Sequence, residues 1–513
     1  MSGNADAIIK TLSIQNPFTQ EQVHEGIRRW PKTLDICLKR ANVITQLKSE
    51  LDKEDKEQTA IHLEKITRLS TTLEPLLREA TPVELEGYGQ VIFQGNPWSS
   101  INFIPFALLI LSFYKSYIVP AFGVILPLLS WILPYLLLIT FYNIPITFSQ
   151  YTSVLWRMWN GQPMPRMDNP EAFMNLPPPP QEDAMTQLRR LAQNGWTLFT
   201  LGQALWHPIQ QARHFIKLDG DCLEIGKSIA ELRSTATALI DSWGKFFPSW
   251  LDSWVKECPT DIRQAFAFVL ETPVWLPHVF RALGRFEVLY ILANRGDVVP
   301  TEFVDSAEPI LMIRDFGDPS IPSQQRVLSS VRLGGGGVKH SVLTGPNRGG
   351  KSSFMRGILT NIVLSHAFGC SFAGKAQMTH FSWIANGLRL DDTPGEKSMF
   401  EREVSFSSGI IQKTDGRGVV LYDELFHSTN PPDAIRSSEI FCGELWKKNN
   451  CLSVVSTHVY GLALQAPPTL VKPICVAAWK MGDTFKFSYN VQKGVCQVSS
   501  VDLVLKQYGL RLL

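Results

Sequence analysis

The stretch Ser341–Phe354, with the sequence SVLTGPNRGGKSSF, decides the fold of this chain. It fits the pattern Gly-x-x-x-x-Gly-Lys-Ser, in which Gly345, Gly350, Lys351 and Ser352 hold the defining positions. An apolar run precedes the loop and a helical pattern follows it, which is the strand–loop–helix context of a phosphate-binding loop. The sequence therefore predicts a nucleoside triphosphate site, and a glycine-rich turn without a ligand is the alternative.

The chemistry of such a loop explains its residue types. Glycines let the backbone N–H groups turn toward phosphate oxygens, and the N-terminus of the following helix adds partial positive charge. Lys351 is expected to reach the β- and γ-phosphates, and the Ser352 hydroxyl is expected to hold Mg²⁺. The predicted cofactors are ATP and Mg²⁺.

Two further segments carry polar residues at the ends of predicted strands. GVVLYDEL (418–425) places Asp423 for the Mg²⁺ shell and Glu424 for polarising the attacking water. CLSVVSTH (451–458) ends in His458, which we expect at the same edge of the sheet, where it could sense the γ-phosphate. An isolated Asp-Glu or His at a strand end is more often structural, but here both follow a phosphate loop.

From about Val299 onward, the residue pattern is typical of an α/β domain. Short apolar runs alternate with helical segments, so a parallel sheet is the expected core. The predicted strands are Ile310–Ile313, Val338–Thr344, Val419–Tyr422, Leu452–Ser456 and Ile474–Ala478.

Composition sets limits on the other classes of site. The 513 residues carry a formal net charge of +2, which does not predict a large positively charged surface for binding nucleic acid. None of the eight cysteines forms a C-x-x-C pair, so we expect reduced core thiols, without a zinc site or a disulfide framework.

Ile104–Tyr142 is almost entirely apolar, with Lys115 as its only charge. A bilayer span needs about 20 apolar residues, so this segment predicts a membrane anchor. We expect a helical hairpin within 98–142, with spans Trp98–Phe113 and Ile118–Phe141 joined by a turn at Tyr114–Tyr117. One kinked span, a re-entrant element or a buried soluble helix pair are the alternatives. A hairpin would keep both ends of the chain on one side, the nucleotide side, which we expect to be cytoplasmic.

The remaining segments are predicted to be helical or to link domains. Arg40–Leu77 shows amphipathic spacing that predicts a short coiled coil or a local helical bundle. The expected helices of the middle region are Ala184–Leu205, Ile225–Phe247, Pro259–Glu271 and Val279–Ala293. The predicted domains are 1–95 (N-terminal helices), 98–142 (membrane hairpin), 160–183 (proline-rich linker), 184–298 (helical lever) and 299–513 (ATPase).

Four motifs resemble the MutS family of ATPases in order and spacing: GPNRGGKSS (345–353), SMFERE (398–403), LYDELFHST (421–429) and STHVYGL (456–462). The resemblance covers roughly 280–513, and residues 184–285 match the family's lever helices only in helical character. It implies an α/β P-loop ATPase fold of the ATP-binding-cassette type.

The resemblance also implies a homodimer with two composite ATP sites. Asn347, Lys351 and Ser352 would hold phosphates and Mg²⁺, His458 would fall on the family's switch histidine, and Ser398 would reach the γ-phosphate bound by the partner subunit. The expected catalytic residues are Glu424 and His458, and the expected metal ligands are Ser352 and Asp423. The expected nucleotide-binding residues are Gly345, Pro346, Asn347, Arg348, Gly349, Gly350, Lys351, Ser352, Ser353 and Ser398.

The sequence also departs from the family. Arg348 stands where the family often has Met, and Phe426–Thr429 replaces the usual Gly-Arg-Gly-Thr, so only Thr429 carries over. None of the 29 phenylalanines has Glu two positions later, so the family's mismatch-reading Phe-x-Glu is missing, and a membrane segment and linker occupy the place of its mismatch, connector and clamp domains. We expect a chain ending without the family's helix-turn-helix tail.

Three functions are compatible with these observations. The first is a membrane-anchored MutS-like ATPase that moves its lever helices when ATP closes the dimer, in processes that include DNA binding or repair. The second is a module that tethers DNA to a membrane, which the resemblance supports and the charge pattern does not. The third is an ATP-gated scaffold with little hydrolysis, against which Glu424 argues.

Overall fold

The fold is that of a computed structural model, which describes residues 2–51, 55–144, 146–159, 183–388, 398–481 and 484–498. The chain divides into two compact units. The sheet unit consists of Met1–Ser70, Thr235–Ser253 and Pro277–Leu513, and the helical unit consists of Thr71–Ser234 and Trp254–Leu276. The predicted domain boundaries stay predictions, and residues 160–182 of the predicted linker lie outside the described residues.

The main sheet carries the phosphate-loop motif. Its strands are, in spatial order, β12 (Thr484–Lys493), β11 (Val471–Met481), β5 (His340–Thr344), β10 (Cys451–Ser456), β9 (Gly418–Tyr422) and β8 (Trp383–Gly387). All neighbours are parallel except β11 and β12, which are antiparallel. The expected parallel core is therefore present, with one antiparallel strand added at its edge.

A second, smaller set of strands lies before and after the loop motif in sequence. Its four-stranded sheet has the order β2 (Glu302–Phe303), β7 (Lys375–Met378), β3 (Ile310–Phe316) and β4 (Ser329–Gly334). A separate pair is formed by β1 (Val299–Pro300) and β6 (Cys370–Ser371). The four-stranded sheet contributes Phe316 of β3 and Ser329 of β4 to the cavity described below.

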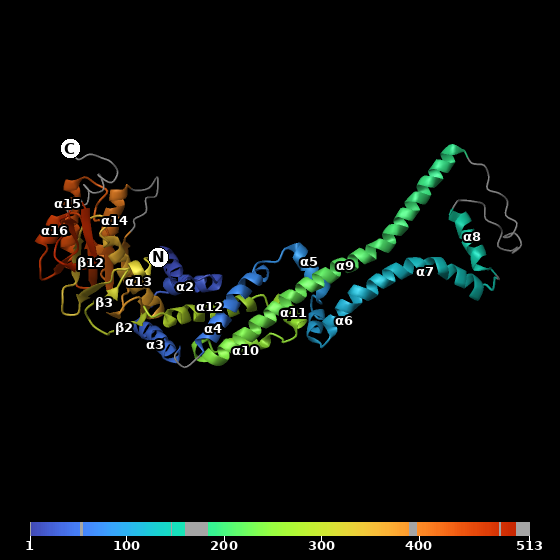
Figure 1. Ribbon diagram of the computed structural model, residues 1–513, viewed down its shortest axis with the longest axis horizontal. Coiled ribbons are helices and arrows are strands. Elements are labelled where there is room, and N and C mark those ends of the chain that lie inside the picture. Colours follow the sequence, from blue (N-terminus) through green and yellow to red (C-terminus); the bar gives the residue numbers. More distant parts are fainter. Residues whose placement is uncertain are drawn as a thin grey trace. The chain divides into compact units, whose positions relative to one another are not determined.

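Helix α13 (Lys351–Phe368), which follows the phosphate loop, is the centre of the core. Three N-terminal helices pack against it (Figure 1): α1 (Ser2–Leu12), α2 (Pro17–Arg28) and α3 (Leu34–Leu51). Their side chains Ile8, Val23 and Ile44 share one buried cluster with Ile358 and Ile362 of α13. Apolar side chains from these N-terminal helices are thus part of the hydrophobic core of the phosphate-loop domain.

Other helices complete the sheet unit and build the helical unit. The sheet unit contains α4 (Lys56–Thr72, ending just past Ser70), α12 (Trp275–Asn294, beginning just before Pro277), α14 (Met399–Gln412), α15 (Pro431–Leu445) and α16 (Tyr460–Gln465). The helical unit contains α5 (Pro82–Val91), α6 (Ala107–Phe113), α7 (Val119–Thr140), α8 (Phe148–Trp159) and α11 (Ile262–Glu271), and α10 (Leu251–Glu257) has residues of both units.

Helix α9 (Ala184–Trp243) is a single helix of 60 residues that contains two of the predicted helices, Ala184–Leu205 and most of Ile225–Phe247. Its residues up to Ser234 belong to the helical unit, and the rest belong to the sheet unit. There the buried Trp243 indole packs against Phe286, with ring centroids 5.8 Å apart, and donates a hydrogen bond to Thr59 Oγ1 at 3.1 Å.

The predicted turn at Tyr114–Tyr117 is wrong. Residues Tyr114–Ile118 form a π-helical segment that joins α6 to α7, so that one helix of 34 residues runs from Ala107 to Thr140. The Lys115 ammonium, which suggested an interfacial turn, instead donates a hydrogen bond to the Gln90 carbonyl at 2.6 Å. The hairpin of Trp98–Phe113 with Ile118–Phe141 is therefore not formed, and the helix resembles the alternative of one kinked segment, with Pro127 and Pro134 inside it.

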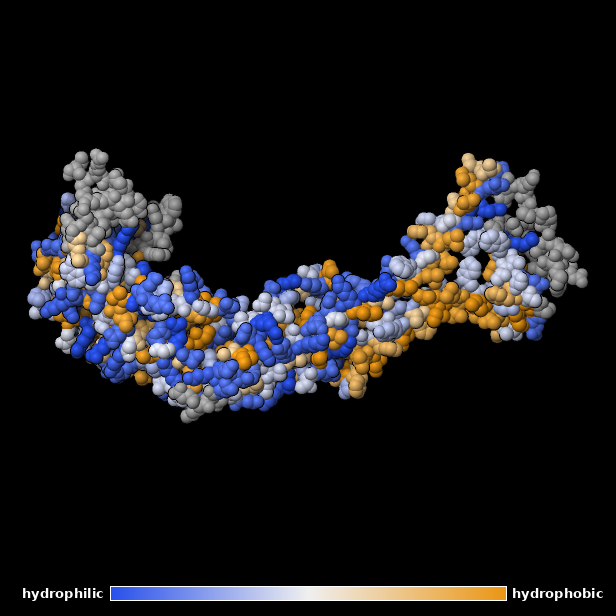
Figure 2. Space-filling view, viewed as in Figure 1, coloured by the Kyte–Doolittle hydropathy of each residue, from blue (hydrophilic) through white to orange (hydrophobic). Residues whose placement is uncertain are grey.

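The helix Ala107–Thr140 is the one helix, among the described residues, that is long and apolar enough to cross a membrane. None of its most apolar window is buried in the protein. Figure 2 shows the hydrophobic surface gathered along this helix and the neighbouring part of α9.

Candidate functional site

The phosphate loop begins where β5 ends, between the parallel neighbours β10 and β11. Gly345 has a φ of 147°, and a Cβ atom on it would lie 2.9 Å from the Val476 carbonyl oxygen on β11. Gly350 has a φ of 101° and directly precedes α13. Both positions therefore require glycine, because a side chain would be strained at either φ and would clash at Gly345.

Lys351 is buried at the first position of α13. Its ammonium donates hydrogen bonds to the carbonyl oxygens of Gly345, at 2.9 Å, and Pro346, at 3.3 Å, and so closes the loop on itself. Burial lowers the pKa of Lys351, and the carboxylates of Glu424 and Asp423 oppose that shift. A lysine held in this way is positioned to exchange the loop carbonyls for an anionic ligand.

Ser352 and Asp423 come together across the loop. The Ser352 hydroxyl donates a hydrogen bond to Asp423 Oδ2 at 2.6 Å, and Ser456 Oγ donates to Asp423 Oδ1. Ser456 lies at the end of β10, and Asp423 follows β9, so neighbouring parallel strands bring the carboxylate to α13. A hydroxyl beside a carboxylate is a set of hard oxygen ligands that suits Mg²⁺.

Glu424 lies next to Asp423 in a left-handed backbone conformation, with a φ of 52°. Its N–H donates a hydrogen bond to Ser456 Oγ at 2.9 Å, which holds this conformation. Its carboxylate oxygen Oε1 lies 3.6 Å from His458 Nε2. The polar contact with His458 lowers the pKa of Glu424 despite partial burial, with further help from the charge of Lys351.

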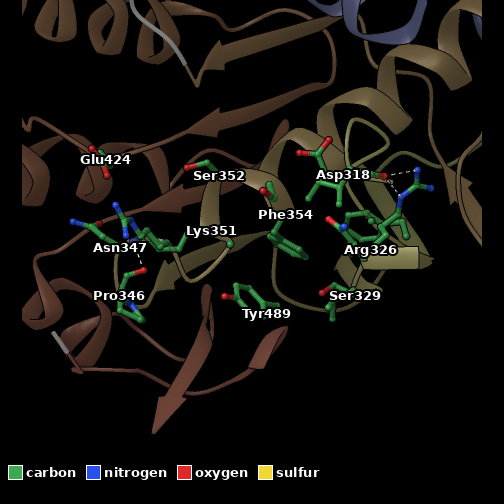
Figure 3. A pocket seen from close by; sticks show the side chains of 18 residues that line it. Asp318, Arg326, Ser329, Pro346, Asn347, Lys351, Ser352, Phe354, Glu424 and Tyr489 are labelled. Carbon is green, nitrogen blue, oxygen red and sulfur yellow. Dashed lines mark hydrogen bonds between the residues drawn. The ribbon is translucent and has the colours of Figure 1, made fainter. Parts of the chain in front are cut away.

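Lys351, Ser352 and Glu424 line one cavity of about 390 Å³ (Figure 3). The predicted residues Pro346, Asn347, Arg348, Gly350, Lys351, Ser352, Ser353 and Glu424 line it. Its other lining residues are Phe316, Gly317, Asp318, Ile321, Gln325, Arg326, Val327, Ser329, Phe354 and Tyr489. In the close-up, Glu424 lies on one side of the loop and Arg326 on the other, with Tyr489 beside the loop.

Sequence reasoning missed the wall formed by β3, β4 and the segment between them. Arg326 donates hydrogen bonds to the carbonyl oxygens of Pro319 and Ile321, and Arg356 of α13 pairs with the buried Asp318 at 2.9 Å. The Arg326 bonds hold the segment between β3 and β4 together, and the Arg356–Asp318 pair attaches it to α13. No motif marks the residues, and only their buried charges at loop positions could have drawn attention to them.

Ser398 is placed apart from the residues that line the cavity. It caps α14: its hydroxyl accepts a hydrogen bond from the Glu401 N–H at 3.2 Å, and Glu401 Oε2 accepts one from the Ser398 N–H at 3.0 Å. Ser398 is exposed at this helix end. Four predicted site residues do not line the cavity but are in polar contact with, or adjacent in sequence to, residues that do: Gly345, Gly349, Asp423 and His458.

The loop that departs from the family's pattern is fixed by a buried carboxylate. Ser428 donates a hydrogen bond to Glu403 on α14, and His427 Nδ1 lies 2.9 Å from the other oxygen of the same carboxylate. The Phe426 ring is buried beside Tyr422. Phe426–Thr429 therefore connects the end of β9 to the helix that Ser398 caps, which the sequence did not reveal.

Comparison with known proteins agrees with this geometry. Residues 341–509 match the family model described as MutS domain V. Over 229 residues, or 42% of this chain, the sequence is 26% identical to "DNA mismatch repair protein spellchecker 1" of Drosophila melanogaster, and the match spans 25% of that protein's length. Family and fold together give one conclusion: the chain is a MutS-like protein with a MutS-type α/β ATPase domain in its C-terminal part.

Proposed function

We propose that this protein is a membrane-anchored ATPase that binds and hydrolyses ATP with Mg²⁺ at sites completed by a second copy of the chain. The observation that carries the proposal is the convergence of Lys351, the Ser352–Asp423 pair and Glu424 around one cavity. Backbone N–H groups, an ammonium and a hydroxyl–carboxylate pair are the set of groups that a magnesium nucleotide needs.

Each residue then has a defined task. Lys351 leaves the loop carbonyls to neutralise phosphate charge, and Ser352 and Asp423 provide oxygen ligands for the metal. The bound magnesium nucleotide supplies the phosphoryl group and a stabilised leaving group. Glu424 orients a water molecule and takes its proton at a carboxylate oxygen, while His458 keeps that carboxylate ionised and in place.

The apolar part of the wall suits a nucleobase. Tyr489 is half-exposed beside the loop, and Ile321 and Val327 line the same cavity. An aromatic ring and two aliphatic side chains provide a stacking surface for an adenine ring.

A second copy supplies the missing side of the site. Ser398 lies exposed at the N-terminus of α14, where a helix end carries partial positive charge. We infer that this helix end contacts the γ-phosphate held by the partner subunit, because it does not line its own cavity. When the dimer closes, the contacts of Glu403 with Ser428 and His427 would transmit the movement of α14 to the end of β9.

The proposed membrane anchor rests on the helix Ala107–Thr140, most of whose apolar side chains, though not Leu108, are exposed on the protein surface. Contiguous exposed apolar surface of this extent marks an interaction site, and its length suits a bilayer. The ATPase domain would lie on the cytoplasmic side.

The matched relative is named a DNA mismatch repair protein, so DNA is the alternative ligand to test. The formal net charge of +2 gives no general electrostatic support for a large DNA footprint. The experiment measures ATP turnover of the detergent-solubilised full-length protein with and without duplex and branched DNA at two salt concentrations. DNA-independent turnover supports a motor acting on protein or membrane, salt-sensitive stimulation supports a DNA tether, and absent turnover leaves the ATP-gated scaffold.

A further inference from the structure

The packing of the N-terminal helices restricts how this chain crosses a membrane. Ile8 and Ile44 share one buried cluster with Ile358 and Leu359 of α13, so residues 2–51 and the ATPase domain form one folded unit. The chain before α6 and the chain after α9 must therefore lie on the same side of any bilayer. Two parts of one hydrophobic core cannot be separated by a membrane.

A single crossing by Ala107–Thr140 would place those two parts on opposite sides. If that helix crosses, the chain must cross back between Thr140 and the point where α9 enters the sheet unit, at Thr235. Most segments of that region are unsuitable. Helix α8 has 12 residues, which is about 18 Å, whereas the hydrocarbon core is about 30 Å thick. Within residues 160–182, charged residues and prolines leave no uncharged run longer than 172–181.

The first part of α9 is the segment of this region that has bilayer length and no formal charge, although it carries four glutamines, an asparagine and a histidine and is less apolar than Ala107–Thr140. The stretch from Leu191 to Ala212 contains no Asp, Glu, Lys or Arg, and Arg190 and Arg213 flank it directly. As a helix this stretch is about 33 Å long, which matches a bilayer span. Its exposed apolar side chains are Leu191, Trp196, Leu198, Phe199, Trp206 and Ile209.

Helices α7 and α9 contact each other near the N-terminal end of α7, which follows Lys115. A Cβ atom on Gly123 would lie 2.8 Å from the Pro208 ring atoms Cβ and Cγ, so the two backbones approach closely there. The Lys115 ammonium lies 5.8 Å from the centroid of the Phe215 ring. These two contacts fix an antiparallel arrangement, because the earlier residue on one helix meets the later residue on the other.

The uncharged lengths of the two helices agree when they are measured from this contact. Helix α7 continues from Gly123 to its end at Thr140, and the uncharged stretch of α9 extends equally far back from Pro208, to Leu191. Figure 2 shows hydrophobic surface along α7 and on part of α9. The two stretches can therefore each cross a layer of the same thickness, starting from a contact at one end and diverging beyond it (Figure 1).

We propose that Leu191–Ala212 is a second membrane span, antiparallel to α7 and in contact with lipid hydrocarbon. The inference rests on the proposed membrane anchor and adds the crossing that the shared N- and C-terminal core demands. Helix α9 then leaves the bilayer near Arg213 and continues without a break to Trp243, which is buried within the sheet unit against Phe286. The proposed second span and the sheet unit therefore share one continuous helix.

The experiment measures which side of the membrane each segment occupies. All eight native cysteines are buried, so single reporter cysteines can be read against a low background. Ser49→Cys, Ser153→Cys and Ser408→Cys each replace an exposed serine, in α3, α8 and α14 respectively. Each full-length variant is translated into sealed microsomal vesicles and treated with a membrane-impermeant maleimide before and after detergent.

Two spans predict that Ser49→Cys and Ser408→Cys are labelled in intact vesicles and Ser153→Cys only after detergent. If Ser153→Cys is labelled in intact vesicles while the protein resists alkaline carbonate extraction, the second span is overturned and the anchor survives as a re-entrant element. If carbonate extracts the protein, both the second span and the proposed anchor fall. A soluble oligomer in that fraction identifies a second copy as the cover of this surface.

A charge placed in α9 tests the span itself. Phe199→Arg introduces a cation near the middle of the stretch, and Ser234→Arg places the same side chain at an exposed site on the other half of the helix. In the Ser153→Cys background, we expect Phe199→Arg to lose most of the protection of the reporter thiol and Ser234→Arg to keep it. Equal protection in both variants would overturn the proposal. ATP binding in detergent checks that both variants fold.

Discussion

Ser352 Oγ lies 2.6 Å from Asp423 Oδ2, so the hydroxyl in the first turn of α13 is hydrogen-bonded to the residue that follows β9. The second oxygen of the same carboxylate accepts a hydrogen bond from Ser456 at the end of β10. Three separate segments of the chain thus meet at one carboxylate beside the phosphate loop. This is where the proposed chemistry requires a metal ligand.

Asp423→Asn is expected to abolish the dependence of nucleotide binding on Mg²⁺ and to slow ATP turnover by roughly 10²-fold or more. The amide keeps the shape of the side chain but removes the charge that the metal requires. Titrating Mg²⁺ against nucleotide affinity and turnover measures both effects. Asp35→Asn, at an exposed pair with Lys39, is the matched control and should leave both quantities unchanged.

His458→Ala should move the acidic limb of the pH–rate profile. The polar contact with His458, at 3.6 Å, is the largest cause that lowers the pKa of Glu424, so removing the imidazole raises that pKa. The base is active only as a carboxylate, and activity in the variant is therefore lost at a higher pH than in the wild type. The profile of kcat/KM from pH 4 to pH 8 measures the shift, and an unmoved acidic limb would show that His458 does not hold Glu424.

Ser398→Ala and Glu424→Gln should each be inactive alone and partly active when mixed. A mixed dimer has one site with both intact groups, so random mixing should restore about a quarter of the wild-type sites. Ser398→Asp retains the helix cap that Ser398 forms with Glu401 but adds negative charge. Full activity of Ser398→Asp, or no recovery on mixing, would contradict a composite site.

Glu287→Gln should stabilise the sheet unit at neutral pH. Burial raises the pKa of Glu287, although Thr19 and Asn16 donate hydrogen bonds to its carboxylate. Because the folded-state pKa is above the unfolded value, the stability of the wild type falls as pH rises through and beyond the ordinary range of a glutamate.

The amide accepts the same hydrogen bonds without a charge, so we expect a gain on the order of 1 kcal/mol at pH 7.5 and none at pH 4. Thermal unfolding in detergent at the two pH values measures it. Glu21→Gln, which alters an exposed pair with Arg281, is the control. An equal change at both pH values would mean that ionisation of Glu287 is not the cause.

The nucleotide site could be predicted from the sequence where local residue patterns determine the structure. The strands β5, β9 and β10 are short apolar runs, and parallel pairing brings the residues that follow them to one edge of the sheet. Gly345 and Gly350 hold positive φ angles that their motif demands. The relation of the loop to Asp423 and Glu424 could therefore be predicted from order and spacing.

The features that could not be predicted from the sequence depend on contacts between residues far apart in the chain. Lys115 looked like an interfacial turn residue, but it lies inside a continuous helix and its ammonium is bonded to the distant Gln90 carbonyl. The bonds of Glu403 to the 426–429 loop join residues about 25 positions apart and leave no periodic trace. The return of the chain through α9 depends on the shared core of Ile8 and Ile358, which no local pattern encodes.

The most direct test of ATP hydrolysis at this site compares ATP turnover and ATP binding in purified full-length wild type and Glu424→Gln. We expect both proteins to bind ATP with similar affinity, because Lys351 and the loop are intact, and the variant to hydrolyse ATP about 10²- to 10⁴-fold more slowly. Equal turnover in the two proteins, with binding retained, would contradict the assignment of Glu424 as the catalytic base, and turnover at the uncatalysed rate in both would contradict the proposed ATPase.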